Sequence, residues 1–163
     1  MDIRIRLIEE AELESVSQVF TEAFNNAGVG ENWSVERAIK YLRYLYQHQP
    51  DLFFIAEAEG EIVGGVAGVI RTWGTGNYLG EWELFVKPEY QKQGIAAKLL
   101  TNIVRSAIDN HAITMFSGLA FSGKAFPMEW YKQIGFHPSG WVHIEADAKE
   151  LLSNLIADHG QNQ

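Results

Sequence analysis

The 163-residue sequence contains no cysteine. This absence excludes disulfide bonds, cysteine-ligated zinc sites and catalytic thiols. The five histidines do not stand at the spacing of a metal-binding motif such as HExxH, and we therefore predict that the protein holds no metal.

Long apolar runs and an excess of basic residues are missing as well. No stretch approaches the roughly 20 apolar residues of a membrane-spanning helix, and residues 1–7 alternate between apolar and charged side chains, unlike a signal peptide. The 13 Lys and Arg are outnumbered by 21 Asp and Glu, which gives a formal net charge of −8. We expect a soluble, cytoplasmic protein that binds neither membrane nor nucleic acid, because nucleic-acid binding needs a basic face. A cationic substrate is compatible with this charge.

What the sequence does contain is typical of one globular domain spanning residues 1–163, with 47% apolar and 21% charged residues. Apolar residues that recur every second position predict strands, and those that recur every third or fourth position predict helices. Predicted strands cover residues 3–7, 52–58, 62–70, 78–86, 113–119 and 136–144. Predicted helices cover residues 13–24, 35–46, about 94–107, 124–134 and 147–157, followed by a frayed tail at 158–163. The resulting order, β-α-α-β-β-β-α-β-α-β plus a C-terminal helix, predicts an α/β (α+β) domain around a mixed sheet.

The stretch after the predicted strand 78–86 favours binding of an anion. The strand ends at Val86, a turn containing Pro88 follows, and a helix begins near Gly94 with small residues in its first turn. The first amides of a helix lack intrahelical acceptors, and the helix dipole makes that end positive. Gly94 would let a phosphate approach the backbone, and Lys92 adds positive charge. A glycine also suits a turn that merely caps a helix, so the loop alone leaves both interpretations open.

Two motifs in the right order resemble those of the GCN5-related N-acetyltransferases. Residues 91–96 (QKQGIA) are similar to the family's Q/R-x-x-G-x-G/A signature, and residues 86–90 (VKPEY) stand in the position of V-x-P-x-Y. Residues 131–136 (YKQIGF) are similar to the family's Y-x-x-x-G-F segment. The resemblance implies a single-domain fold with a mixed, mostly antiparallel central sheet flanked by helices, with its motif core at about residues 78–137.

The resemblance also implies the cosubstrate and the residues that hold it. The cosubstrate would be acetyl-CoA, whose acetyl group passes to a primary amine. The family's pantetheine-binding strand corresponds to Leu84, Phe85 and Val86. The pyrophosphate loop and helix start correspond to Gln91, Lys92, Gln93, Gly94, Ile95, Ala96 and Ala97. Lys124 replaces an asparagine common in the family, and could meet a CoA phosphate instead.

Amine acetylation needs a proton acceptor for the amine and a proton donor for the departing thiolate. Tyr131 matches the family tyrosine that acts as donor, although it could instead be a packed aromatic residue. For the acceptor we prefer Glu83 to Glu81; residues 82–84 (WEL) resemble the aminoglycoside 6'-N-acetyltransferases, whose glutamate faces the substrate. Both carboxylates lie two apart on one strand and should share a face. Either could instead line a solvated cleft or pair with Arg71, and a water relay could replace a side-chain base.

The expected acceptor is a small, cationic primary amine that resembles a polyamine, an aminoglycoside or an amino acid. The first two helices and the motif strand should bind it through an aromatic and acidic pocket, although each aromatic residue could equally belong to the core. The candidates are Trp33, Tyr41, Tyr44, Trp73 and Trp82. The alternatives are a protein or peptide amine as acceptor and a non-catalytic CoA-binding regulatory module. A homodimer is part of the prediction.

Overall fold

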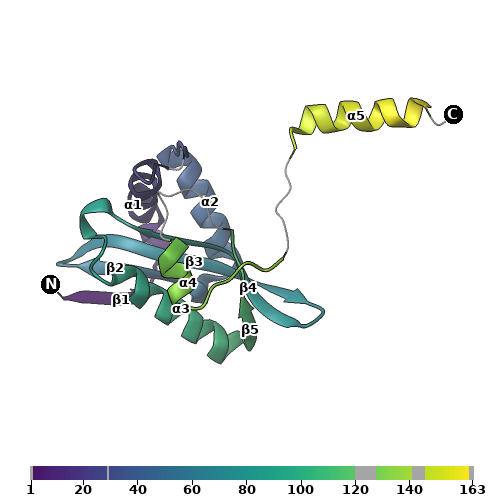
Figure 1. The fold of residues 1–163 in the computed structure, drawn as a ribbon. Helices are drawn as coiled ribbons and strands as arrows, with labels where there is room; N and C mark the ends of the chain where they lie inside the picture. The colour runs from purple at the N-terminus through teal and green to yellow at the C-terminus, as the bar shows by residue number, and fades with distance from the viewer. Residues whose placement is uncertain (1, 29, 120–127, 141–145, 162–163) are drawn as a thin grey trace. The chain divides into compact units, whose positions relative to one another are not determined.

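The computed structural model describes residues 2–28, 30–119, 128–140 and 146–161 (Figure 1). The chain divides into two compact units, Met1–Met128 and Glu129–Gln163, which are described separately below.

The first unit is built on a five-stranded sheet. Its strands are β1 (Ile3–Leu7), β2 (Phe53–Ala58), β3 (Glu61–Trp73), β4 (Gly76–Val86) and β5 (Ile113–Phe116). Their order in the sheet is β1-β2-β3-β4-β5; the first three pairings are antiparallel, and β4 pairs with β5 in parallel. The predicted α/β fold with a mixed, mostly antiparallel sheet is confirmed.

Three long helices cover the two faces of this sheet. They are α1 (Leu13–Asn25), α2 (Val35–His48) and α3 (Ile95–His111), with short 3-10 turns η1 (Glu10–Glu12), η2 (Pro50–Leu52) and η3 (Pro88–Tyr90). Helices α1 and α2 lie on one face and α3 on the other (Figure 1). The Ser34 side chain accepts a hydrogen bond from the Arg37 amide, and so caps α2 as its position before the apolar stripe suggests.

Two hairpins set the register of the central strands. Between β2 and β3 the predicted turn is present, and Glu59 and Gly60 both have positive φ, 52° and 83°, as two-residue hairpin turns require. Between β3 and β4, Trp73 pairs with Gly76. The connection between the predicted strands 62–70 and 78–86 is therefore only the two-residue turn at 74–75, and both strands are longer than their apolar runs.

The second unit contains most of α4 (Met128–Gln133) and all of α5 (Ala148–Gln161). The Asp147 side chain accepts hydrogen bonds from the amides of Lys149 and Glu150, each at 3.0 Å, and so caps α5 where the sequence predicted a helix start. Helix α5 continues through Gly160 to Gln161, beyond the end predicted at about residue 157. Residues 124–127 of the predicted fourth helix lie outside the described residues.

Two strand predictions near the second motif differ from the structure. The strand predicted at 136–144 is wrong over residues 136–140, which have no regular secondary structure, and its remainder lies outside the described residues. Pro138 has no amide to donate to a ladder, and Gly140 has a φ of 83°, so this segment cannot continue as an extended strand. The strand predicted at 113–119 ends at Phe116, where β5 separates from β4.

Candidate active site

A bulge in β4 marks the start of the candidate site. Ala67 pairs with Glu83 and Val69 pairs with Gly80, so two residues of β4 stand opposite one residue of β3. The first of the two, Glu81, has a φ of 44°, which is uncommon for a residue with a side chain. Such a bulge bends a strand and redirects the side chains that follow it.

Beyond the bulge, β4 and β5 part. Their pairing covers residues 77–79 of β4, and the last backbone hydrogen bond between these segments runs from the Ser117 amide to the Leu79 carbonyl at 2.9 Å. Farther along, residues 84–86 of β4 still pair with β3. Within the described residues, no strand pairs with their other edge. The polar backbone of β4 is therefore open on that side to an extended ligand.

Backbone alternation decides which groups face the opening. The Lys87 amide donates to the Val63 carbonyl of β3, whereas the Val86 carbonyl accepts from the Gln91 side chain at 3.0 Å. Because successive residues of a strand point their N–H and C=O groups in opposite directions, Leu84 and Val86 face the opening and Phe85 faces β3. The ring of Phe85 packs edge-on against Phe20 in the core, with ring centroids 5.2 Å apart. Of the three predicted pantetheine residues, two present their backbone to the gap.

The loop after β4 leads into an exposed helix start. Gly94 is the N-cap of α3 with a φ of 80°, and Lys92 also has a positive φ, 59°. The first bond of α3 runs from the Lys98 amide to the Gly94 carbonyl. The amides of Ile95, Ala96 and Ala97 therefore have no acceptor within the helix.

The surroundings of this helix start suit an anionic group. A Cβ atom at Gly94 would meet no atom within 4 Å, so the space over the amides is open, and the first turn of α3 carries no acidic residue. The side chain of Gln93 donates to the Glu89 carbonyl, and that of Gln91 to Val86, so both glutamines brace the loop. The geometry fits the pyrophosphate of CoA. The remaining predicted phosphate contact, Lys124, lies outside the described residues.

The two glutamates of β4 both reach α2, as their spacing of two predicts, but their environments differ. The Tyr41 hydroxyl donates to Glu83 Oε1 at 2.8 Å, and the Tyr44 hydroxyl donates to Glu81 Oε2 at 3.2 Å. Glu81 is exposed and also pairs with Arg71, one of the alternatives that the sequence left open. Glu83 is partly buried and hydrogen-bonded to a hydroxyl.

The surroundings of Glu83 change its acidity. Burial raises the pKa of Glu83 to about 7, and the negative charge of Glu31 acts in the same direction, against the hydrogen bond from Tyr41. The pKa of Tyr41 is raised in turn by burial and by the neighbouring carboxylate. Glu83 can thus exchange a proton near neutral pH, which is what a general base for an amine needs.

An aromatic wall stands beside Glu83. The ring of Trp33 stacks on Tyr41 with centroids 5.6 Å apart and an interplanar angle of 24°, and its indole N–H donates to Glu31 at 2.6 Å. The side chain of Asn25, at the end of α1, accepts a hydrogen bond from the Trp33 amide at 2.8 Å and donates one to the Trp33 carbonyl at 3.0 Å. Glu31 and Asn25 are not predicted from the sequence, since both lie in or beside a glycine-containing loop that gives no periodic signal.

The remaining pocket candidates lie apart from this wall. Trp73 is at the end of the β3–β4 hairpin with 63% of its surface exposed. The indole of Trp82 donates to the Ser117 carbonyl and lies towards β5. Trp33, Tyr41 and Tyr44 donate hydrogen bonds to Glu31, Glu83 and Glu81, respectively.

Tyr131 belongs to the second unit. It lies in α4 with 5% of its surface exposed, and its ring contacts those of Trp130 and Phe136, with centroids 5.2 and 5.4 Å away. Its carbonyl accepts a hydrogen bond from the Phe136 amide at 2.9 Å, which closes the turn at Gly135. Its role as the proton donor stays a prediction.

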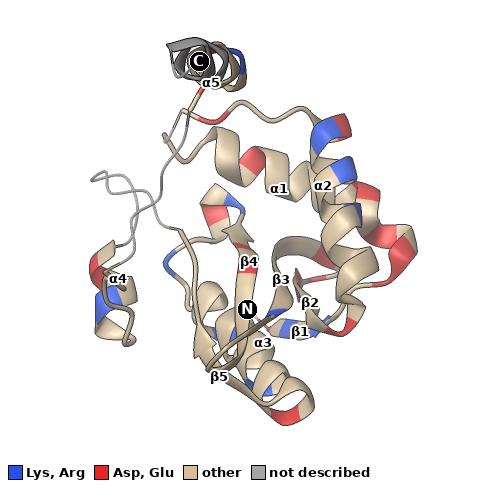
Figure 2. Ribbon diagram, turned by 90° about the vertical axis from the view of Figure 1, so that its right-hand side faces the viewer, with Lys and Arg blue, Asp and Glu red and all other residues tan. Residues whose placement is uncertain are grey.

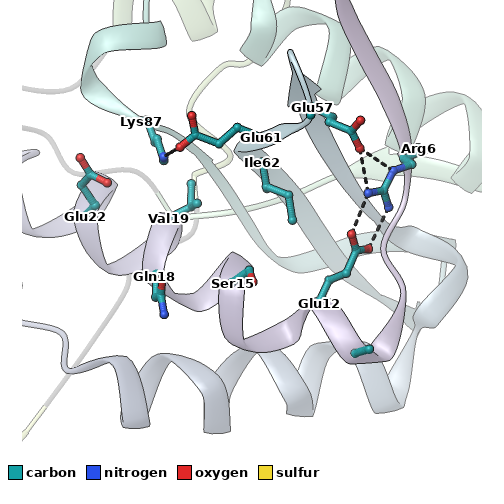
Figure 3. A pocket seen from close by; sticks show the side chains of 12 residues that line it. Arg6, Glu12, Ser15, Gln18, Val19, Glu22, Glu57, Glu61, Ile62 and Lys87 are labelled. Atoms are coloured by element: carbon teal, nitrogen blue, oxygen red, sulfur yellow. Dashed lines mark hydrogen bonds and ion pairs between the residues drawn. The ribbon is translucent and has the colours of Figure 1, made fainter.

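A hollow of about 480 Å³ lies away from these groups, between α1 and the β2–β3 turn (Figure 3). Its two cations are already neutralised: Arg6 binds Glu12 and Glu57, and Lys87 pairs with Glu61. Because neither cation that lines it is available to a phosphate, the hollow does not compete with the start of α3 as a coenzyme site.

Two further properties of the described residues bear on function. In that part of the chain, no group of three or more His, Asp or Glu side chains is placed to hold a metal ion. None of the described helices combines the length and apolar character needed to cross a membrane.

A split parallel strand pair that leads to an open helix start, with the partly buried Glu83 on the same strand, fits a coenzyme-dependent transferase. Comparison with known proteins identifies the family of transferases to which the chain belongs. The model of the acetyltransferase (GNAT) family matches residues 13–136, so the chain belongs to that family. It is an acetyl-CoA-dependent N-acetyltransferase, as the two sequence motifs predicted.

Individual relatives agree with this assignment. An acetyltransferase from Photorhabdus laumondii is 31% identical over 108 residues, which cover 65% of this chain and 67% of that protein. Among solved structures, a possible acetyltransferase from Clostridium difficile 630 is similar with a TM-score of 0.74 and 14% identity, over 90% of this chain and 97% of that one. The aminoglycoside N-acetyltransferase AAC(6')-Iy in complex with CoA has a TM-score of 0.69 and 16% identity, over 90% and 95% of the two chains. At these identities the structures show a shared fold.

Proposed function

We propose that the enzyme transfers the acetyl group of acetyl-CoA to a primary amine of a small, cationic molecule of the polyamine, aminoglycoside or amino-acid-like type. The observation that carries this proposal is Glu83, a partly buried carboxylate held by Tyr41 beside the Trp33 ring and the charge of Glu31. An ammonium group is attracted both to carboxylates and to the faces of aromatic rings. A neutral or anionic acceptor would gain from neither.

The coenzyme lies along the open edge of β4 in this proposal. The backbones of Leu84 and Val86 bind the pantetheine arm, and the amides at the start of α3 bind the pyrophosphate, with Lys92 adding charge. Bound acetyl-CoA supplies an activated acetyl group as a thioester. Two features support this orientation of the coenzyme, with its phosphates at α3 and its thioester near Glu83. Phosphate prefers a helix N-terminus, and the bulge brings Glu83 next to the end of the open edge.

The chain's own residues then move two protons. Glu83 accepts a proton from the substrate ammonium, and the freed amine attacks the acetyl carbonyl. A carbon–nitrogen bond forms and the carbon–sulfur bond breaks. The departing sulfur takes the hydroxyl proton of Tyr131, and the second proton that the attacking nitrogen loses returns to the Tyr131 oxygen. Tyr41 keeps Glu83 in place through its hydrogen bond of 2.8 Å.

The test measures thiol release from acetyl-CoA with polyamines, aminoglycosides, amino acids and peptides as acceptors. We expect turnover with one of the cationic small molecules. Turnover with peptides alone would show that the proposed acceptor class is wrong.

A matched pair of variants then tests the base with the best acceptor. Glu83→Gln keeps the shape and the hydrogen bond from Tyr41 but cannot accept a proton, so kcat/KM should fall by about 10²–10⁴-fold and lose its decline below pH 7. Glu81→Gln, on the same strand and already paired with Arg71, should lower it by only a few-fold. If Glu81→Gln instead causes the larger loss of kcat/KM, Glu81 is the base. If both variants lose only a few-fold, a water relay is favoured.

A further inference from the structure

Trp82 occupies an unusual position in the gap between β4 and β5. It directly follows the bulge residue Glu81, and its indole N–H donates to the Ser117 carbonyl at 3.1 Å. Its ring meets that of Phe116 edge-on, with centroids 4.9 Å apart. A Cβ atom added to Gly118 would overlap the indole nitrogen, so the indole lies directly against the backbone that follows β5.

At this point the side chain of Trp82 takes the place of backbone hydrogen bonds between β4 and β5. Tyr78 pairs with Met115 and Leu79 with Phe116. If this register continued, the next residues of β4 would face Ser117 and Gly118. The bulge turns β4 away instead, and the indole fills the space between β4 and the Ser117 carbonyl. The gap therefore has one closed end, at Trp82, and one open end, at the start of α3.

The direction of the coenzyme follows from these two ends. With phosphate at the start of α3 and pantetheine on Leu84 and Val86, as in the proposed function on which this inference rests, the thioester lies next to Glu83. The acyl group attached to that thioester would point to the closed end, where Trp82 lies.

We propose that Trp82 is a specificity-determining residue that limits the length of the transferred acyl chain. Acetyl, with one methyl group beyond the carbonyl, fits in front of the indole, whereas propionyl and butyryl would run into it. The indole cannot easily move aside, because its N–H is fixed on Ser117 and its ring is held by Phe116 and Gly118. A single extra methylene in a closed pocket is typically discriminated by about 10–200-fold.

The experiment compares acetyl-CoA, propionyl-CoA and butyryl-CoA with one amine acceptor in wild type and Trp82→Ala. In wild type, kcat/KM should fall by about tenfold or more for each added methylene. In Trp82→Ala the ratio of butyryl to acetyl transfer should rise by about tenfold or more. Trp73→Ala removes an exposed tryptophan and should leave the ratio between acyl donors unchanged. An unchanged ratio in Trp82→Ala overturns the proposal, and so does a wild type that uses butyryl-CoA as well as acetyl-CoA.

A binding measurement separates this inference from the proposed acceptor. Calorimetry with free CoA, acetyl-CoA and butyryl-CoA needs no amine. Wild type should bind butyryl-CoA more weakly than acetyl-CoA, and Trp82→Ala should remove that difference while its affinity for free CoA is retained. If Trp82→Ala does not fold, Trp82→Phe, which keeps a ring for Phe116 but is shorter, decides: propionyl-CoA should become a donor and butyryl-CoA should not. Rejection of propionyl-CoA by that variant contradicts the role of Trp82.

Discussion

Individual residues of β4 that are close in sequence differ in what they can do. Glu81 is exposed and neutralised by Arg71, which suits it to hold the surface of the site. Glu83 is partly buried, and the Tyr41 hydroxyl that donates a hydrogen bond to it cannot neutralise its charge. Such an arrangement costs folding free energy, and it is retained where a carboxyl group must change protonation state near neutral pH.

That cost leads to a stability prediction for Glu83→Gln. In the unfolded chain the carboxyl has its ordinary pKa of 4.5, and in the folded enzyme its pKa is about 7. The folded state therefore binds more protons between these values, and stability falls as pH rises from 4.5 to 7. At pH 8, Glu83→Gln should raise the free energy of unfolding by ~2 kcal/mol, or the Tm by roughly 4–6 °C. At pH 5 the gain should be much smaller.

Thermal unfolding at both pH values checks this. Glu81→Gln is the control, and its Tm should change little at either pH because its ion pair is exposed. A Glu83→Gln variant less stable than wild type at pH 8 would mean that the carboxylate is stabilised by groups other than Tyr41.

A second residue prediction concerns Tyr131. Tyr131→Phe keeps the ring that packs on Trp130 and Phe136 and removes only the hydroxyl group. Loss of the proton donor should lower kcat by about 10²-fold. Pre-steady-state measurement of acetyl transfer checks the chemical step itself, and an unaltered rate of that step would leave Tyr131 with a packing role only.

Among the elements, the start of α3 depends on the backbone of Gly94. Its φ of 80° disfavours alanine, and the open space above it is where the phosphates are proposed to lie. Gly94→Ala should lower stability by about 1–2 kcal/mol and also weaken CoA binding. Gly94→Asn suits the left-handed conformation better, so it should nearly keep the wild-type Tm and still weaken CoA binding by about tenfold or more, because its side chain covers the amides. Calorimetry with CoA and thermal unfolding separate the two effects, and unchanged CoA affinity in Gly94→Asn would contradict the phosphate site.

Most elements could be predicted from local patterns. Alternation identified β1, and three- and four-residue spacing identified α1 and α2, because each signal lies within a few neighbouring residues. The bulge at Glu81 could not be predicted, since a charged residue gives no hint of a positive φ. The contact between Tyr41 and Glu83 joins residues 42 apart and depends on how α2 packs on the sheet. Residues 136–140 are predicted to be a strand from their apolar spacing. They contain Pro138, which has no backbone N–H to donate to a neighbouring strand.

At the scale of the whole molecule, the net charge should have opposite electrostatic effects on the proposed cationic acceptor and on acetyl-CoA. The sequence has a net charge of −8, and Asp and Glu residues occur along α1, α2 and β4 (Figure 2). This field attracts a cationic acceptor and repels acetyl-CoA, which is itself an anion.

Salt should therefore act in opposite directions on the two Michaelis constants. Raising the ionic strength from 0.01 to 0.15 M shortens the screening length from about 30 to 8 Å. KM for the amine should rise several-fold, and KM for acetyl-CoA should fall or stay constant. Initial rates with each substrate varied in turn provide the measurement, and equal shifts of both constants in one direction would contradict a cationic acceptor.

The parallel pairing of β4 and β5 also has a consequence for the order of events in folding. Antiparallel neighbours such as β3 and β4 can zip together from a two-residue turn, but parallel neighbours need a long crossover. Here the crossover is residues 87–112, and it contains α3. The loop-closure entropy of that segment must be met before the pair can form. The hairpins should therefore appear first during refolding, and the capacity to bind coenzyme should return only in the later kinetic phase, when α3 docks and β5 joins the sheet.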